Sequence, residues 1–153
     1  MNLKVNEIFY SLQGEGGRTG EASIFIRLSK CNLACSFCDT DFAAYTEKSL
    51  EEIASEISRF PCKWIIWTGG EPTLQLTDEV VAFFKSKGYM QAIETNGTRT
   101  VPTGLDYITC SPKQHFETIR TRIPRVNELR FPIQKGDFCN EYPCFQDREG
   151  NGP

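Results

Sequence analysis

The sequence predicts a mixed α/β domain whose strands form an open, partial β/α barrel. Apolar, strand-like segments alternate with segments of helical periodicity, which implies right-handed connections between parallel strands. Every expected strand after the first ends in a small group of polar residues, as in β/α folds that build a site from several loops. The strands are too few for a complete eight-stranded barrel.

The first part of the chain holds an apolar segment and a buried strand. Residues 5–12 are apolar and run into a glycine-rich turn at residues 13–17. Residues 22–29 are typical of a strand covered on both faces, because their apolar positions are continuous apart from Arg27. An arginine in such a strand needs an anionic partner, which could be a structural ion pair or a substrate carboxylate.

Two helices are expected between the strands that follow. Ser49 and Glu52 form an S-x-x-E capping box, and helical spacing continues over residues 49–59. A second helix begins at Thr77 and ends at Gly88, and its aromatic residues belong to the core. The further strands are expected at residues 63–68, 89–98, 105–110 and 126–133.

Composition indicates a globular domain in a reducing compartment. The chain has 153 residues, of which 39% are hydrophobic and 24% charged, and its net charge of −3 argues against a nucleic-acid-binding surface. No apolar run approaches a membrane span, and no signal-peptide core follows the N-terminus. We therefore expect the seven cysteines to be reduced thiols in the cytoplasm. Cys62 and Cys110 are expected to be small buried apolar side chains.

Three cysteines, Cys31, Cys35 and Cys38, are spaced C-x3-C-x2-C, and the next cysteine is Cys62. A four-iron cluster normally takes four thiolates. Three thiolates on one loop could hold three irons and leave the fourth open to a ligand that receives an electron. Zinc would need a second pair or histidines, but the single histidine, His115, lies outside any such pattern, and disulfides need an oxidising compartment.

A second motif, Gly69-Gly70-Glu71-Pro72, ends the strand expected at residues 63–68. Glycines at a strand end let backbone groups approach a ligand closely, and Glu71 could accept a hydrogen bond from a ligand ammonium. The two motifs together resemble the radical S-adenosylmethionine (radical SAM) family. In that family SAM chelates the open iron and the glycine-rich turn holds its amino group. The resemblance implies the partial β/α barrel of the radical SAM type.

Further stretches resemble one branch of that family, the 7-carboxy-7-deazaguanine synthases of queuosine biosynthesis, a tRNA modification pathway. The resemblance covers residues 5–136, and the matching stretches are 7–16, 25–28, 38–40, 94–98 and 111–113. The implied lyase reaction contracts 6-carboxy-5,6,7,8-tetrahydropterin to 7-carboxy-7-deazaguanine with loss of ammonia. A 5′-deoxyadenosyl radical made from SAM would take hydrogen from the substrate, and SAM would then be re-formed.

The resemblance assigns roles to the residues at matching positions. Cys31, Cys35 and Cys38 would bind a [4Fe-4S] cluster, and Thr40 would give its hydroxyl to a Mg²⁺ ion that bridges to substrate. The SAM pocket would be lined by Phe37, Cys38, Asp39, Gly70, Glu71, Gly97, Ser111, Pro112 and Lys113. The pterin would be held by Leu12, Gln13, Gly14, Glu15, Thr95 and, at its carboxylate, Arg27.

The resemblance also implies a homodimer and a low-potential electron donor such as flavodoxin or ferredoxin. Two alternatives stay open. A radical SAM activase, which makes a glycyl radical on a partner enzyme, shares the cysteine loop but gives no obvious task to residues 13–15, Arg27 or Thr40. A non-catalytic iron–sulfur or zinc module would leave the Gly-Gly-Glu-Pro turn unexplained, and metal analysis would separate it.

The family pattern ends near residue 137. We expect residues 1–137 to form the radical SAM core domain and residues 138–153 to be a disordered tail, because they are polar and lack periodicity. The C-x4-C pair Cys139 and Cys144 could be an auxiliary site. Family members continue with further elements, so a truncated or altered C-terminus is expected to leave the last strand an uncovered edge. The chain should then be marginally stable and a poor catalyst.

Overall fold

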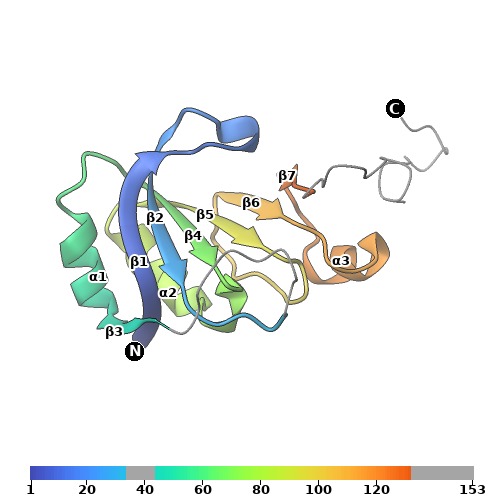
Figure 1. Ribbon diagram of the computed structural model, residues 1–153, viewed down its shortest axis with the longest axis horizontal. Coiled ribbons are helices and arrows are strands. Elements are labelled where there is room, and N and C mark those ends of the chain that lie inside the picture. Colours follow the sequence, from blue (N-terminus) through green and yellow to red (C-terminus); the bar gives the residue numbers. More distant parts are fainter. Residues whose placement is uncertain (34–43, 132–153) are drawn as a thin grey trace.

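The structure, a computed structural model, describes residues 1–33 and 44–131 as one seven-stranded sheet with three α-helices (Figure 1). The strands are β1 (Asn2–Leu12), β2 (Ala22–Leu28), β3 (Thr46–Ser49), β4 (Trp64–Gly69), β5 (Met90–Thr95), β6 (Tyr107–Cys110) and β7 (Glu128–Leu129). The helices are α1 (Leu50–Ile57), α2 (Asp78–Ser86), α3 (Phe116–Arg122) and two short 3₁₀ turns, η1 (Gly16–Arg18) and η2 (Pro72–Leu74).

The strand order is β3-β1-β2-β4-β5-β6-β7. Strands β2, β4, β5, β6 and β7 are parallel, which confirms the predicted open α/β fold. Strands β1 and β3 run antiparallel to their neighbours and extend the sheet beyond the predicted parallel part. Strand β3 was not predicted, because the segment 46–49 is polar and half-buried or exposed and shows no apolar alternation.

The two predicted helices lie where their capping signals place them. Ser49 Oγ accepts from the N–H of Glu52, and the Glu52 carboxylate accepts from the N–H of Ser49, so the capping box is complete. Thr77 caps α2 through the N–H of Val80. No helix in the described part of the chain is long and apolar enough to cross a membrane.

Besides β3, helix α3 and strand β7 differ from the sequence prediction. Helix α3 was missed, although Phe116, Ile119 and Ile123 repeat at helical spacing and Ile119 and Ile123 are buried. Residues 96–106, all of them described, contain no helix, so β5 and β6 are joined by turns. The strand expected at 126–133 is shorter within the described residues, where β7 pairs only through Glu128 and Leu129.

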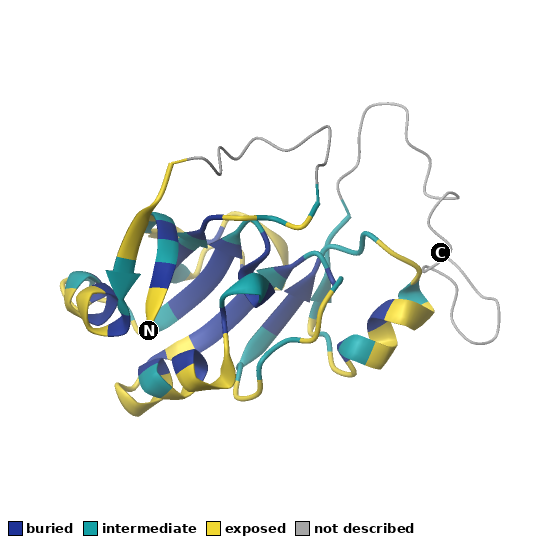
Figure 2. Ribbon diagram, turned by 90° about the horizontal axis from the view of Figure 1, so that it is seen from below, coloured by how far each residue is buried: buried dark blue, intermediate teal, exposed yellow. Residues whose placement is uncertain are grey.

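The two faces of the sheet are covered differently. On one face the inward side chains of all three helices join the strands in one large apolar core, which includes Trp67, Phe84 and Ile119. Figure 2 shows the helices with buried inner sides and exposed outer sides against mostly buried strands. The opposite face carries a smaller cluster around Phe25 and Ile66 and has no α-helix among the described residues.

The glycine-rich segment 13–21 folds over that second face. The N–H of Gln13 donates to Glu21 O (2.9 Å), which closes the segment at its base. The Arg18 guanidinium lies 3.6 Å from the centre of the Trp64 ring and is paired with Glu21, and Arg18 is only 6% exposed. A glycine-rich turn is thus anchored on the sheet by a stacked arginine.

Cys62 and Cys110, both predicted to be buried, differ in how far they are buried. Cys110 is fully buried, and burial raises the pKa of its thiol to about 11, with a further contribution from the charge of Glu71. Cys62 is half-buried, and its thiol donates to Ala22 O (3.1 Å).

The capping box can be tested on stability. Ser49→Ala removes the acceptor for the Glu52 N–H and should lower the free energy of unfolding by about 1 kcal/mol. The control is Ser55→Ala, an exposed position inside α1, where alanine favours the helix slightly. Urea unfolding of both variants gives the comparison. Equal free energies of unfolding for the two variants would contradict a capping role for Ser49.

Candidate active site

Polar residues form a row across the open face of the sheet. Glu7 pairs with Arg27 and Arg27 with Thr68, while Glu94 pairs with Thr109 and Thr109 with Glu128. The hydroxyl of Thr68 donates to the Glu94 carboxylate (2.8 Å) and joins the two halves. The row lies two residues beyond the apolar cluster around Phe25, on the same face and toward the carboxyl ends of the parallel strands. Active sites in β/α folds occupy this end.

Arg27 has a partner within the fold. Its Nε donates to Glu7 Oε1 at 2.6 Å, with side chains 28% and 50% exposed respectively. This is the structural ion pair that the sequence left as one of two readings. Its exposure leaves the guanidinium within reach of a ligand, and contact with a substrate carboxylate stays a prediction.

The glycine pair of the second motif packs against backbone. A Cβ added to Gly70 would lie 1.9 Å from Lys30 O, and one added to Gly69, whose φ is +111°, would lie 2.3 Å from Leu28 O. The N–H of Gly70 donates to Leu28 O (3.0 Å) and that of Glu71 to Lys30 O (2.9 Å). The close approach that we expected toward a ligand is therefore made, in this structure, to the segment that leads into Cys31.

Glu71 is completely buried and turned toward the protein. Its Oε1 accepts from the N–H and hydroxyl of Thr73 (3.1 and 2.6 Å) and from the hydroxyl of Thr95 (2.8 Å). Its Oε2 accepts from the N–H of Asn96 (2.7 Å). The carboxylate thus ties the end of β4 to the end of β5, whereas the sequence reading placed it against a ligand ammonium.

The other predicted SAM residues lie at the ends of β5 and β6. The N–H of Ser111 donates to Thr95 O (2.8 Å), so the start of segment 111–113 is beside the turn at Gly97. Gly97 has φ +77°, and a Cβ there would lie 2.8 Å from the Cys110 sulfur. Thr95, predicted to touch substrate, is 4% exposed and accepts from the Gly97 N–H (3.2 Å). These residues are brought together, and their contacts with ligands stay predictions.

Cys31 follows β2 at the same end of the sheet, with a free, half-buried thiol. The next residue, Asn32, donates to the Thr98 hydroxyl (2.9 Å) and accepts from the Asn96 amide (3.1 Å). These bonds tie the start of the cysteine loop to the turn after β5. Sequence reasoning predicted the polar turn after this strand, for which an Asn-Gly pair is a known signal, but did not name Asn32 or Asn96 as site residues.

Several predicted residues lie outside the described part of the chain. They are Cys35, Phe37, Cys38, Asp39, Thr40, Cys139 and Cys144, together with the tail 138–153. Among the described residues, no group of three or more His, Cys, Asp or Glu side chains is arranged to hold a metal ion. Thiolates are the ligands that iron–sulfur clusters take, so the free thiol of Cys31, beside the Gly70 turn, fits a cluster site.

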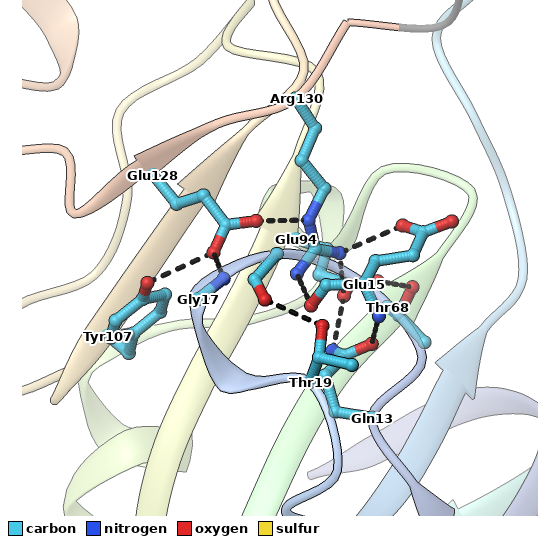
Figure 3. A network of polar contacts seen from close by, with 10 residues as sticks. Gln13, Glu15, Gly17, Thr19, Thr68, Glu94, Tyr107, Glu128 and Arg130 are labelled. Atoms are coloured by element: carbon cyan, nitrogen blue, oxygen red, sulfur yellow. Dashed lines mark hydrogen bonds and ion pairs between the residues drawn. The ribbon is translucent and has the colours of Figure 1, made fainter.

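The predicted pterin residues Gln13 and Glu15 belong to a polar network (Figure 3). Gln13 is 6% exposed, and its amide donates to Glu94 Oε1 (3.1 Å). Arg130, directly after β7, contacts Glu15, Glu94 and Glu128. Leu12 and Gly14 are exposed beside this network. Sequence reasoning named neither Arg130 nor Glu94 as a partner of the glycine-rich loop, because they lie far away in the sequence.

Comparison with known protein families shows the superfamily of this chain. The family model of the radical SAM superfamily matches residues 25–130, from within β2 to the residue after β7. A chain with this fold, a cysteine loop after β2 and a Gly-Gly-Glu turn after β4 is a radical SAM protein, as the sequence motifs predicted.

Individual relatives narrow the family. The 7-carboxy-7-deazaguanine synthase of Bacteroides thetaiotaomicron is 49% identical over 138 residues, which cover 90% of this chain and 74% of the relative. The synthase of Haemophilus influenzae is 43% identical, covering 90% and 68%, and that of Neisseria meningitidis 44%, covering 94% and 76%. This chain belongs to the 7-carboxy-7-deazaguanine synthase family, which confirms the predicted branch over the activase alternative.

A solved structure supports the same assignment. The crystal structure of QueE from Escherichia coli superposes with a TM-score of 0.76 and 28% sequence identity, covering 86% of this chain and 71% of that one. The predicted radical SAM type of partial barrel is therefore confirmed.

The contact of Gly70 with the backbone before the cysteine motif predicts that adding one methyl group at Gly70 lowers stability strongly. Gly70→Ala should destabilise the fold by several kcal/mol, because its Cβ would overlap the Lys30 carbonyl and that backbone would have to move. Gly14→Ala is the matched control, since a Cβ at Gly14 meets nothing within 4 Å. Thermal unfolding of the cluster-free chain measures both. A Gly70→Ala melting temperature equal to that of Gly14→Ala would contradict the packing role.

Proposed function

We propose that this chain converts 6-carboxy-5,6,7,8-tetrahydropterin to 7-carboxy-7-deazaguanine with loss of ammonia. The observation that carries the proposal is that Cys31, the Gly69–Glu71 turn and the loop with Gln13 and Glu15 lie around one open sheet face. The family pattern assigns these three elements to the cluster, to SAM and to the pterin. The relatives' shared name supports the same reaction.

The proposed cofactors are a [4Fe-4S] cluster held by Cys31, Cys35 and Cys38, and SAM. Together they supply the one-electron chemistry when bound. The residues proposed to line the SAM pocket are Phe37, Cys38, Asp39, Gly70, Glu71, Gly97, Ser111, Pro112 and Lys113. The protein would orient both groups at the carboxyl end of the sheet.

The pterin is proposed to contact Leu12, Gln13, Gly14, Glu15, Arg27 and Thr95. Exposed Leu12 offers an apolar contact for a ring, while Gln13 and Glu15 supply polar groups. Arg27 is suited to a carboxylate, because its present partner Glu7 is half exposed and can be exchanged for a ligand.

Other features of the protein are proposed from the resemblance. Thr40 would give its hydroxyl to a Mg²⁺ ion whose remaining ligands are water and substrate oxygens, which suits a small ion that keeps its waters. Residues 1–137 would be the radical SAM core. A homodimer, a flavodoxin or ferredoxin as electron donor, and a cytoplasmic location complete the proposal.

The cluster assignment predicts which cysteines matter. Anaerobically reconstituted protein should hold about four irons per chain and form 7-carboxy-7-deazaguanine from the pterin. Cys31→Ala should abolish both SAM cleavage and product formation. Cys62→Ala should retain both, because the Cys62 thiol donates to Ala22 O at the start of β2, whereas Cys31 follows the end of that strand. Iron analysis and chromatography of the product measure this. Loss of the cluster in Cys62→Ala would refute the assignment, and a loaded wild-type chain without product would refute the proposed reaction.

The carboxylate contact predicts a selective binding defect. Arg27→Met should weaken pterin binding about tenfold or more, the effect of losing a charge-assisted pair worth roughly 1.5–3 kcal/mol, and should leave SAM binding intact. Lys48→Met is the control, since it breaks an ion pair of similar exposure, Lys48–Glu56, on β3 and α1. Calorimetric titration separates the two ligands. Unchanged pterin affinity in Arg27→Met would remove Arg27 from the substrate site.

A further inference from the structure

We propose that Arg130 is a positioning residue that fixes the loop 13–21 in its substrate-binding geometry. This inference rests on the proposed function, because it takes Gln13 and Glu15 as pterin contacts. Arg130 follows β7, whereas Glu15 lies in the loop between β1 and β2, 115 positions earlier in the chain. Figure 3 shows the Arg130 side chain among the carboxylates of Glu15, Glu94 and Glu128.

Arg130 holds Glu15 by its backbone as well as by its side chain. Its Nη2 donates to Glu15 O (3.2 Å), and its Nη1 to Glu15 Oε2 (3.2 Å). The Arg130 side chain is 15% exposed, but that of Glu15 is 72% exposed. The backbone of the loop tip is thus pinned while the Glu15 carboxylate faces outward, where a ligand can reach it.

A second branch of the network fixes Gln13. Arg130 Nη1 donates to Glu94 Oε1 (2.6 Å), the same oxygen that accepts from the Gln13 amide (3.1 Å). The other oxygen of Glu94 accepts from Thr68 (2.8 Å), so the carboxylate is held from the sheet. The Gln13 side-chain oxygen accepts in turn from the N–H of Glu15 (3.1 Å). Gln13 and Glu15 are therefore oriented together.

A third branch fixes the η1 part of the loop. Glu128 accepts from Arg130 Nε, and its other oxygen accepts from the Gly17 N–H (2.9 Å) and the Tyr107 hydroxyl (3.0 Å). Burial alone would raise the pKa of Glu128, but the hydrogen bonds from Arg130, Gly17 and Tyr107 outweigh it and lower the pKa. Glu128 consequently stays ionised as the acceptor that joins β7 to the loop.

The single guanidinium of Arg130 contacts Glu15, Glu94 and Glu128, which suits an arginine to holding the loop 13–21. Its planar fork presents donors in fixed directions, so Nε reaches Glu128 while the two terminal nitrogens reach Glu94 and Glu15. A lysine ammonium, as a point charge, cannot bond all three acceptors in this arrangement. Without the arginine, the partly buried carboxylates of Glu94 and Glu128 would repel each other and release Gln13 and Gly17.

The test compares Arg130→Met, Arg130→Lys and a control, Arg120→Met. Within the described part of the chain, Arg120 forms an ion pair with exposed Glu117 alone, at 3.9 Å. Amide hydrogen exchange is measured first on the protein without SAM or pterin. Arg130→Met should raise exchange in residues 13–21 at least tenfold, with β4 and β5 unchanged, and the control should match the wild type. Arg130→Lys should restore part of this protection.

Kinetics of the reconstituted enzyme provide the second readout. Arg130→Met should raise the KM for the pterin about tenfold and leave SAM binding unchanged, and Arg130→Lys should fall between it and the wild type. If Arg130→Met loosens the whole sheet, Glu128→Gln, which keeps the side-chain shape, should still raise exchange at Gly17 and raise KM.

Unchanged loop exchange and unchanged KM in Arg130→Met would overturn this inference alone. Equal exchange in Glu128→Gln and wild type would do the same where the first variant is unstable. A reconstituted wild-type chain that binds SAM but does not convert the pterin would instead overturn the proposed function. The exchange measured without ligands would then still report whether Arg130 anchors the loop.

Discussion

The arrangement of the site depends on the buried carboxylate of Glu71. An isolated charge in this position would cost several kcal/mol, but four donors from Thr73, Thr95 and Asn96 compensate for its desolvation. The bonds fix the turn after β4 against the turn after β5. Because the Glu71 N–H donates to Lys30 O, the same residue also fixes the segment that enters the cysteine loop. Three of the loops around the site thus share one anchor.

The sheet separates stability from function by its faces. The helix face buries the large aliphatic and aromatic side chains, and removing water from that surface supplies most of the folding free energy. The open face has only a small apolar cluster and places charged residues in line across neighbouring strands. Such a row would be unfavourable under a helix. It is stable here because Arg27, Thr68 and Arg130 pair with the carboxylates of Glu7, Glu94 and Glu128.

The features that could be predicted from the sequence are those formed by residues close together in the chain. The Ser49–Glu52 box spans three positions and the Gly69–Glu71 turn follows its strand directly, so both were found. The contact of Arg130 with Glu15 spans 115 positions and that of Gly17 with Glu128 spans 111. Such pairings depend on the strand order, which composition and periodicity do not determine. Strand β3 was missed for a related reason, because pairing with β1 outweighs its weak strand preference.

Two glutamates of the site, Glu7 and Glu71, differ in how easily a ligand could replace them as hydrogen-bond acceptors. The Arg27–Glu7 pair is half exposed, and such pairs contribute only about 0–1 kcal/mol, so a substrate carboxylate can replace Glu7 at little cost. Releasing Glu71 would instead leave buried hydroxyl and N–H groups unpaired, at roughly 1–3 kcal/mol each. Arg27 is therefore suited to meet a ligand directly. Glu71 acts on the proposed SAM pocket by holding the backbone of the turns that line it.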